Sequence, residues 1–398
     1  MFPGSLKSQS DTAMTDSLPI RPLADYPVPY RSESGKAPER LQTAVRMSAD
    51  GFLAAARAGT AILWQGDYHQ ARQLLAAAAR RLRKPPKPAA TPAEAFHKHR
   101  LARAQHSRLL NMLLVETDAA GCLTLPRAPD IQAALADVYG SAAQSAALIP
   151  LKQLLGFIGA HEWHKKGVEI DGLDGRIHVP YGVFSPLRGE YLPLVMQAAL
   201  PRNTREAWDI GTGSGVLAAL LARRGVPHIT ATDTNSRAAA CARANAERLG
   251  LAARITVEER SLFPEGYADL IVCNPPWLPA KPTSAVETAL YDPGHAFLHA
   301  LLAGAASRLN PGGELWLVMS DLAEHLGLRA PDELAGLFGQ NGWRVCAVHT
   351  ARARHPKAAD PTDPLAFARM REQTALYILQ PESRFQAAPA SRNTRNTA

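Results

Sequence analysis

The chain has 398 residues, 46% of them hydrophobic and 20% charged, and carries a formal net charge of +8. This composition is typical of a soluble globular protein of two or three domains, and no apolar run approaches the ~18 residues of a membrane span, which excludes an integral membrane protein. The N-terminus shows no secretory signal pattern and the four cysteines form no C-x-x-C pair, so we expect a cytoplasmic protein without disulfides or structural zinc.

The first part of the chain divides by its hydrophobic pattern. Residues 1–40 are rich in Ser, Pro and charge without a sustained period, and we expect them to be disordered. In residues 41–165 apolar side chains recur at helical spacing, most clearly at Ala71, Leu74, Leu75 and Ala78. We therefore predict a helical N-terminal domain, interpreted as a substrate-recognition domain, with a proline-rich linker at 83–92.

Basic residues concentrate in this predicted helical domain. The segment from Arg80 to Arg108 contains nine Lys and Arg residues and a single acidic residue, Glu94. This segment accounts for the net charge of the whole chain, so the rest of the chain is nearly neutral. Such a segment can hold the phosphates of a nucleic acid, or it can be an ordinary solvated helix face. Both interpretations remain open at this point.

The pattern changes at about residue 166. Val168–Ile170 and Ile177–Val179 flank a glycine-containing turn and predict a β-hairpin linker. Short β-rich runs then alternate with helical runs, which predicts an α/β domain over 166–381 with a doubly wound parallel sheet, closed by an antiparallel hairpin. The predicted strands are 206–210, 228–233, 254–258, 268–273, 314–319, 343–349 and 375–379, the clearest helices are 216–224, 236–249 and 296–309, and 382–398 is a predicted disordered tail.

A glycine-rich turn follows the first strand of this domain. The strand ends at Asp209 and Ile210, and the turn Gly211-Thr212-Gly213-Ser214-Gly215 leads directly into a helix. Cofactors approach the backbone at such turns. A dinucleotide fingerprint would need glycine where this chain has Val216, which favours a ligand without a pyrophosphate. Asp233, at the end of the next strand, is placed to accept hydrogen bonds from two ribose hydroxyls.

The fourth strand of the domain ends in Asn274-Pro275-Pro276-Trp277. Two prolines stiffen this peptide and leave its carbonyls free to accept hydrogen bonds. The Asn274 side-chain oxygen and the Pro275 carbonyl can each take one N-H of an amino group, while Trp277 stacks on the flat group that carries it. Two acceptors also stabilise the positive charge that develops when such a nitrogen attacks a methyl sulfonium.

These motifs resemble those of the class I methyltransferases that use S-adenosyl-L-methionine, especially the release-factor glutamine methyltransferases and the ribosomal RNA base methyltransferases. The resemblance covers about residues 167–380 and implies a Rossmann-like seven-stranded methyltransferase sheet. It implies that Asp209, Gly211–Gly215 and Asp233 bind the cofactor, that Leu262 lies against its adenine, and that Asn274 contacts both cofactor and substrate. Segment 182–186, Gly-Val-Phe-Ser-Pro, resembles the family's sequence at the start of the catalytic domain.

We therefore expect an N-methyltransferase that acts on a planar amino nitrogen. The basic segment favours a nucleobase of RNA or DNA over the alternative, a glutamine amide of a protein. Two other classes are considered: a nicotinamide-dependent oxidoreductase, which the glycine spacing opposes, and a non-catalytic nucleic-acid-binding protein. The sequence indicates no membrane partner and does not indicate an oligomeric state.

Three further groups of residues lie outside these motifs. His161 and His164 can share one helix face, but no third ligand is suggested, so we expect no metal site. Arg352, Arg354, His355 and Lys357 precede the last predicted strand and are candidates for the substrate entrance. We interpret the four cysteines as buried reduced thiols.

Overall fold

The computed structural model describes residues 20–33, 36–85, 88–187, 189–282, 285–353, 360 and 362–382. The chain divides into two compact units, Met1–Lys84 with Gln105–Gly156, and Pro85–Ala104 with Phe157–Ala398. Residues 85–104, expected to lie in the N-terminal domain, thus belong to the unit that contains the glycine-rich turn. None of the helices in the described ranges is long and apolar enough to cross a membrane.

The first unit is built on a five-stranded sheet in the order β1-β2-β3-β4-β5. Strands β2, β3 and β4 are parallel, and β1 and β5 pair antiparallel at the two edges. The strands are β1 (Arg21–Pro22), β2 (Arg40–Ala44), β3 (Thr60–Trp64), β4 (Leu113–Thr117) and β5 (Ala147–Pro150). Its helices include α1 (Ala49–Arg57), α2 (Tyr68–Leu82) and α4 (Gln132–Tyr139), and short 3-10 turns lie at Leu23–Asp25 and Gly140–Ala143.

This sheet corrects the expectation of a helical N-terminal domain. The helix through Ala71 and Ala78 is confirmed as α2, but five strands were missed. All five residues of β3 are buried, so the strand shows no alternation of apolar and polar residues, and a short apolar run cannot be told from a buried helix segment. The expected disorder of 1–40 is wrong from residue 20 onward, where β1 pairs with β2 and Leu23 joins a core cluster; residues 1–19 and 383–398 lie outside the described ranges.

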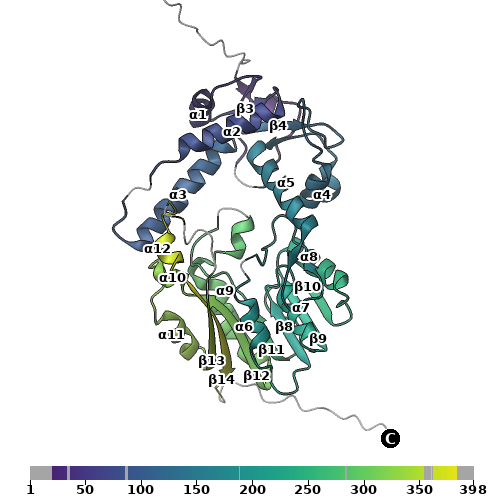
Figure 1. Cartoon of the computed structure of the whole chain (residues 1–398), viewed down its shortest axis with the longest axis vertical. Coiled ribbons are helices and arrows are strands. Elements are labelled where there is room, and N and C mark those ends of the chain that lie inside the picture. The colour runs from purple at the N-terminus through teal and green to yellow at the C-terminus, as the bar shows by residue number, and fades with distance from the viewer. Residues whose placement is uncertain are drawn as a thin grey trace, which may run out of the picture. The chain divides into compact units, whose positions relative to one another are not determined.

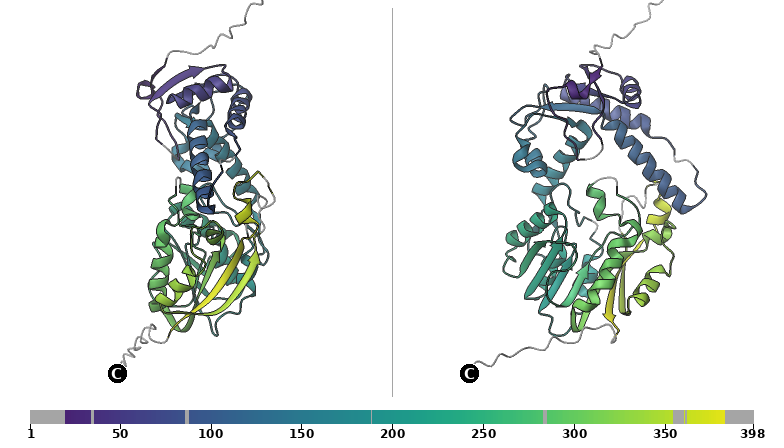
Figure 2. Two further views of the ribbon diagram at one scale, coloured as in Figure 1. Left: turned by 90° about the vertical axis from the view of Figure 1, so that its left-hand side faces the viewer. Right: turned by 180° about the vertical axis from the view of Figure 1, so that it is seen from behind.

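The second unit contains the predicted doubly wound sheet, in the order β10-β9-β8-β11-β12-β14-β13 (Figure 1). Neighbouring strands are parallel except that β14 is antiparallel to both β12 and β13. The antiparallel pair of β13 and β14 is the hairpin that the sequence predicted. Figure 2 shows the twist of this sheet from two further sides. The strands are β8 (Glu206–Ile210), β9 (His228–Asp233), β10 (Ile255–Glu259), β11 (Ala268–Cys273), β12 (Leu309–Ser320), β13 (Trp343–Arg352) and β14 (Gln373–Pro381).

Alternating side chains of the strands pack into two cores, one on each face of the sheet. Ala207 of β8 packs with α6 (Leu192–Gln197), α7 (Val216–Arg223) and α8 (Ser236–Arg248). Its neighbour Trp208 packs on the other face with α9 (Ala296–Ala305) and α11 (Glu333–Gln340). The chain order reverses between β8 and β11, and ligands of open α/β sheets bind at the carboxyl ends of strands at such a point.

Shorter elements complete the second unit. The end of α5 (Leu151–Lys166) leads into the predicted hairpin, formed by β6 (Val168–Glu169) and β7 (Arg176–Ile177). Helix α3 (Pro92–Leu110) contributes its residues up to 104. The remaining pieces are α10 (Leu322–His325), α12 (Ala366–Arg369) and the 3-10 turns η3 (Ala285–Ala289), η4 (Pro293–His295) and η5 (Ala306–Arg308). Residues of α3, α10 and α12 share a small separate core.

Candidate active site

The predicted site residues meet at the carboxyl edge of the sheet. Ile210 pairs with Cys273 on one side and with Thr232 on the other, so the glycine-rich turn, Asn274 and Asp233 follow three adjacent strands. Leu262, after β10, joins them because the Thr232 hydroxyl donates a hydrogen bond to the Leu262 carbonyl at 2.6 Å. The sheet therefore brings four segments of the chain to one place.

The glycine-rich turn is held by backbone and carboxylate contacts. The N-H groups of Gly211 and Thr212 both donate to the Thr232 carbonyl, at 2.8 and 2.9 Å. The buried Asp209 carboxylate accepts from the Thr212 hydroxyl at 2.7 Å and from the Ala218 N-H at 3.0 Å, which joins the turn to the first residues of α7. Asp209 thus has a structural role in shaping the turn, beyond the cofactor contact that the resemblance implies.

Three glycines of the turn have positive φ, but their surroundings differ. The φ angles of Gly211, Gly213 and Gly215 are 71°, 58° and 80°. A Cβ added to Gly213 would meet nothing within 4 Å, whereas at Gly215 it would lie 3.1 Å from the Cα and Cβ of Ala242 on α8. Gly215 therefore serves close packing of the turn against α8, and Gly213 leaves open space beside Asp233.

This difference predicts unequal effects of two matched substitutions. Gly215→Ala is expected to lower the free energy of unfolding by about 3 kcal/mol, because both the left-handed backbone and the crowding at Ala242 oppose a side chain. Gly213→Ala meets only the backbone cost and should lose about 1 kcal/mol. Urea unfolding followed by circular dichroism measures both losses. Equal losses would show that contact with α8 does not constrain position 215.

Burial also changes the acidity of Asp209. Desolvation raises the pKa of its carboxyl group from 3.8 to about 6, although the bonds from Thr212 and Ala218 favour the ionised form. Because the folded pKa lies above the unfolded one, the folded state binds this proton more tightly. Ionised Asp209 therefore lowers stability above pH ~6, and this penalty disappears as the pH falls towards ~4.

An Asp209→Asn variant isolates this effect. In protein without cofactor, we expect the unfolding free energy of the wild type, relative to the variant, to increase by about 2 kcal/mol as the pH falls from 7 to 4.5. Urea titrations of both proteins at four pH values provide the measurement. Because all other titrating groups are shared, parallel curves for the two proteins would contradict a raised pKa at Asp209.

The Asp233 carboxylate is oriented by two backbone groups. Its Oδ2 accepts from the Gly213 N-H at 3.0 Å and its Oδ1 from the Asn235 N-H at 2.8 Å. The side chain is half-buried, and a carboxylate retains further lone pairs after two such bonds. This arrangement fits a ligand with a pair of neighbouring hydroxyls placed over Gly213, as a ribose has. Asp233 also fixes the glycine-rich turn to the end of β9.

Leu262 stands out by its backbone. Its φ of 54° is left-handed, which is uncommon for a residue other than glycine, and its side chain is half-buried. Strained backbone of this kind tends to occur at functional sites. The position, beside Thr232 and next to the Asp233 strand end, fits an apolar contact for a flat base carried by the same ligand.

The Asn-Pro-Pro-Trp segment is partly closed by its own tryptophan. The Trp277 indole N-H donates to the Asn274 side-chain oxygen at 3.0 Å, and the Trp277 ring packs against the cores on both faces of the sheet. The sequence predicts a ring that is free to stack on a substrate. In the structure this ring occupies one lone pair of the Asn274 oxygen, which leaves the second for an incoming amino group. Pro275 is buried and Pro276 half-buried.

Two polar residues that no sequence motif indicates also support the site. Tyr191, at the start of α6, is buried; desolvation and the charge of Asp209 raise its pKa, and a hydrogen bond with Asn274 opposes that rise. Asn245 of α8 is also buried, and its amide donates to the carbonyls of Ser214 and His178 at 2.9 and 3.0 Å. Asn is an unfavourable residue in the middle of a helix. Its presence inside a predicted helix is the sequence feature that could have indicated a special role for Asn245.

The basic segment is divided between the two units. Arg80 to Lys84 lie at the end of α2 and directly after it, in the first unit, while Lys98, Arg100 and Arg103 lie in the second unit. Arg81 pairs with Asp50 at 2.8 Å, Lys98 with Glu94 at 2.7 Å and Arg100 with Glu287 at 3.3 Å. Lys84 and Arg103 are exposed. The ordinary helix-face interpretation therefore holds for part of the segment.

Other expected features differ in place or exposure. Arg352 is the exposed last residue of β13, while Arg354, His355 and Lys357 lie outside the described ranges. All four cysteines are free, as expected, but only Cys241 and Cys273 are buried. Burial raises the pKa of Cys241 to about 12 and, together with the charges of Asp209 and Asp233, raises that of Cys273. Both buried thiols are therefore neutral.

Comparisons with known proteins agree with this geometry. The family model of the methyltransferase small domain matches residues 174–343. A release factor glutamine methyltransferase of Geobacter sulfurreducens is 34% identical over 38% of this chain and 57% of its own length, and one of Deinococcus radiodurans is 32% identical over 54% and 75%. A tRNA1(Val) (adenine(37)-N6)-methyltransferase of Tolumonas auensis is 30% identical over 50% of this chain and 81% of its own length.

The match to the Geobacter protein thus covers less than two thirds of that relative, whereas three quarters or more of the other two are covered. The glycine-rich turn, Asp233 and Asn274 all lie within the matched residues 174–343. The strands that carry them belong to the seven-stranded sheet. The chain belongs to the methyltransferase small-domain family of class I S-adenosylmethionine-dependent methyltransferases.

Proposed function

We propose that this protein transfers a methyl group from S-adenosylmethionine to a planar amino nitrogen. The observation that carries the proposal is the position of Asn274, one strand away from the glycine-rich turn and two from Asp233. A nitrogen held at Asn274 then lies beside a cofactor held by Asp233. The cofactor, when bound, supplies an electrophilic methyl carbon on a sulfonium.

The residues of this chain would divide the work as follows. Asp233 binds the ribose hydroxyls, Leu262 contacts the adenine, and Gly213 lets the cofactor approach the turn. The Asn274 oxygen and the Pro275 carbonyl accept the two N-H groups of the substrate amine and so orient its nitrogen. These acceptors also stabilise the positive charge that develops on nitrogen, so no strong general base is required.

We propose a nucleobase of RNA or DNA as the substrate. The Tolumonas relative, named for methylation of an adenine in tRNA, is matched over a larger share of its length than the Geobacter relative named for a release factor glutamine. The net charge of +8 also favours a polyanionic partner. A protein glutamine amide is the second candidate, because that amide presents the same planar NH2 group and two of the relatives carry this function in their names.

Isotope labelling distinguishes these substrates. Extract from a strain that lacks the gene is incubated with the purified protein and cofactor labelled in its methyl group, and is then divided among ribonuclease, deoxyribonuclease and protease. The proposal predicts that a nuclease releases the label as small fragments. Label released only by protease would transfer the assignment to glutamine, and cofactor binding without any labelled product would indicate a non-catalytic binding protein.

The exposed basic residues give a separate prediction. Arg83→Glu with Lys84→Glu, at two exposed residues that follow α2 in the first unit, should weaken binding to RNA and reduce the salt dependence of binding, by about one unit of log-log slope for each phosphate that the variant no longer holds. Arg100 is excluded from this set because it is paired with Glu287. Filter binding at several salt concentrations measures the slope, and cofactor titration confirms that the site is intact. An unchanged slope would remove these two residues from the nucleic-acid surface.

A further inference from the structure

The chain that follows Trp277 folds back on itself. The Leu278 N-H donates to the Leu290 carbonyl at 3.3 Å, and the Asp292 N-H donates to the Leu278 carbonyl at 2.9 Å. Leu278 and Tyr291 also form an isolated parallel bridge. The described residues 278–282 and 285–292, called here the return segment, therefore begin directly after the Asn-Pro-Pro-Trp motif and finish beside its end. Whatever holds the return segment also limits the movement of Trp277 and Asn274.

Helix α3 supplies part of that support. Phe96 is 2% exposed and lies in one small core with Ala280 of the return segment, and Leu278 and Tyr291 pack against it. The ring centroids of Phe96 and Tyr291 are 6.4 Å apart, and the rings meet edge to face. These contacts come from a helix far outside the residues 174–343 that define the family. A part of the chain that precedes the family domain thus completes the packing beside its motif.

Arg100, one turn after Phe96, makes the polar contacts. Its guanidinium donates to the Lys281 carbonyl at 2.6 Å and to the Glu287 carboxylate at 3.3 Å. The same group lies over the Tyr291 ring, 4.0 Å from its centroid. The side chain of Arg100 is only 18% exposed. One guanidinium therefore contacts the beginning, the middle and the end of the return segment.

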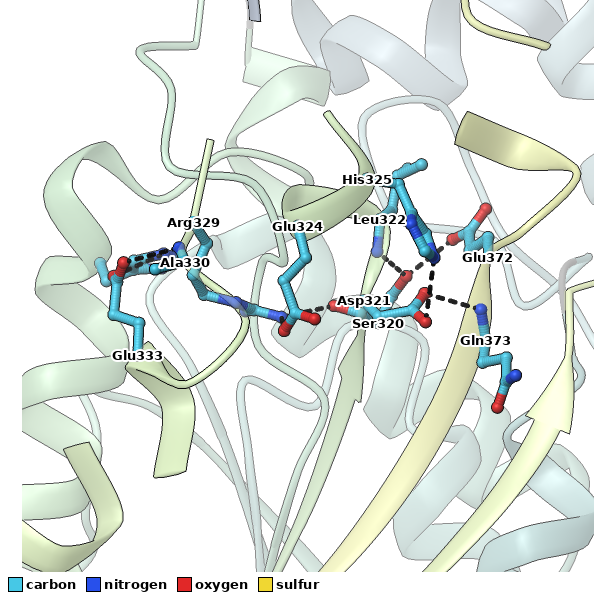
Figure 3. A network of polar contacts seen from close by, with 11 residues as sticks. Ser320, Asp321, Leu322, Glu324, His325, Arg329, Ala330, Glu333, Glu372 and Gln373 are labelled. Carbon is cyan, nitrogen blue, oxygen red and sulfur yellow. Dashed lines mark hydrogen bonds and ion pairs between the residues drawn. The ribbon is translucent and has the colours of Figure 1, made fainter. Parts of the chain in front are cut away.

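A polar network surrounds α10, whose Leu322 packs against the same small core (Figure 3). Leu322 and Leu326, on and after α10, pack with Phe96. Their helix is anchored because Arg329, 1% exposed, donates to the Ser320 carbonyl at 2.8 Å and to Glu324 at 3.1 Å. The return segment thus shares one core with α3 and with an anchored α10, so removal of the Arg100 side chain would release its contacts with α3.

We propose that Arg100 is a positioning residue for methyl transfer. It acts through Lys281, Glu287 and Tyr291 on the return segment, and through that segment on the Asn274 oxygen and the Pro275 carbonyl. The inference rests on the proposed function, because it concerns the geometry of the same amine site. It assigns to the basic helix a role in orienting the acceptor groups in place of phosphate binding by Arg100.

The test compares Arg100→Lys with Arg103→Lys in the full chain. Lysine keeps the charge at position 100 but lacks the planar fork needed to contact Lys281, Glu287 and Tyr291 together. The same change at the exposed Arg103, on the same helix, is the matched control. Initial rates use RNA from the deletion strain as substrate, and calorimetry measures binding of S-adenosylhomocysteine. Hydrogen exchange of residues 278–292 is followed by mass spectrometry.

For Arg100→Lys we expect kcat to fall about tenfold, with cofactor affinity and the KM for RNA changed less than about twofold, because misplaced acceptors reduce the rate of the chemical step. Hydrogen exchange should increase within the return segment only. Arg103→Lys should match the wild type in kcat and in exchange. Glu287→Gln should show a smaller decrease in kcat, because it weakens one of the three interactions of Arg100.

Two outcomes would overturn the inference. Faster exchange with an unchanged kcat would show that Arg100 serves stability alone, and unchanged exchange would show that it does not hold the return segment. If the wild type methylates no RNA, the substrate assignment fails, and rates are then measured on the labelled product class from the extract. The exchange data remain valid in that case, so failure of the proposed substrate and failure of the inference are distinguishable.

Discussion

Replacing Asn274 by alanine is expected to reduce methyl transfer by about 10²–10³-fold, the usual effect of removing one group that stabilises developing charge. The substitution removes the oxygen that receives the substrate N-H and also releases Trp277, which donates to that oxygen at 3.0 Å. Binding of the cofactor analogue S-adenosylhomocysteine should decrease far less than methyl transfer, because only the implied Asn274 contact is lost and Asp233 and the glycine-rich turn are untouched. Single-turnover rates with saturating cofactor provide the measurement.

The matched control for this prediction is Asn310→Ala. Asn310 donates to Asp269 at 2.7 Å at the opposite end of the sheet, where β11 and β12 begin. The same chemical change there should alter stability without altering the single-turnover rate. If Asn274→Ala kept a rate close to that of the wild type, the amine would have to be bound elsewhere, and the proposed amine site would be wrong.

The second large effect is expected at Asp233. Asp233→Ala removes the acceptors for two ribose hydroxyls, and two hydrogen bonds to a charged group contribute about 3 kcal/mol, which corresponds to a decrease of about 100-fold in cofactor affinity. The substitution also releases the N-H groups of Gly213 and Asn235. Calorimetric titration with S-adenosylhomocysteine measures the change directly.

Asp233→Asn separates the effect of the negative charge from that of the hydrogen-bond acceptors. It keeps one acceptor oxygen but removes the charge, so an affinity intermediate between the wild type and Asp233→Ala is expected. The unfolding temperature of each variant shows whether the turn remains folded. An affinity unchanged in Asp233→Ala, with a folded protein, would mean that the ribose lies away from β9. Asp233 is thus expected to control cofactor affinity, whereas Asn274 is expected to control the rate.

The second unit could be predicted from the sequence because its strands carry clear signals. β8, β9 and β11 begin and end at the predicted residues, since each run is short, rich in β-branched or aromatic residues, and bounded by turn residues. The first unit could not. Its sheet contains β1 and β4, which are separated by about ninety residues, and only the folded chain brings such strands together. Its fully buried β3 lacks the alternation that marks a strand.

The site shows the same division. The glycine-rich turn, Asp233 and the Asn-Pro-Pro-Trp motif are each short stretches at the end of a predicted strand. The expected strand order therefore predicts that they lie close together. Tyr191 and Asn245 act through buried contacts with residues that lie far away in sequence, at Asn274 and His178. The sequence suggests Arg100 as a phosphate ligand because charge is its only visible property. Its actual partner Glu287 lies 187 residues away, and no pattern within a helix can reveal such a pair.

The place of β14 has a practical consequence for anyone who isolates this domain. β14 lies between β12 and β13 in the sheet but follows both in sequence, and it begins thirty residues beyond the end of the family match. A truncated clone that stops at residue 343 would leave the long β12 paired with β11 alone, as an exposed edge strand. Such an exposed edge invites intermolecular association, so a shortened product is expected to aggregate during expression.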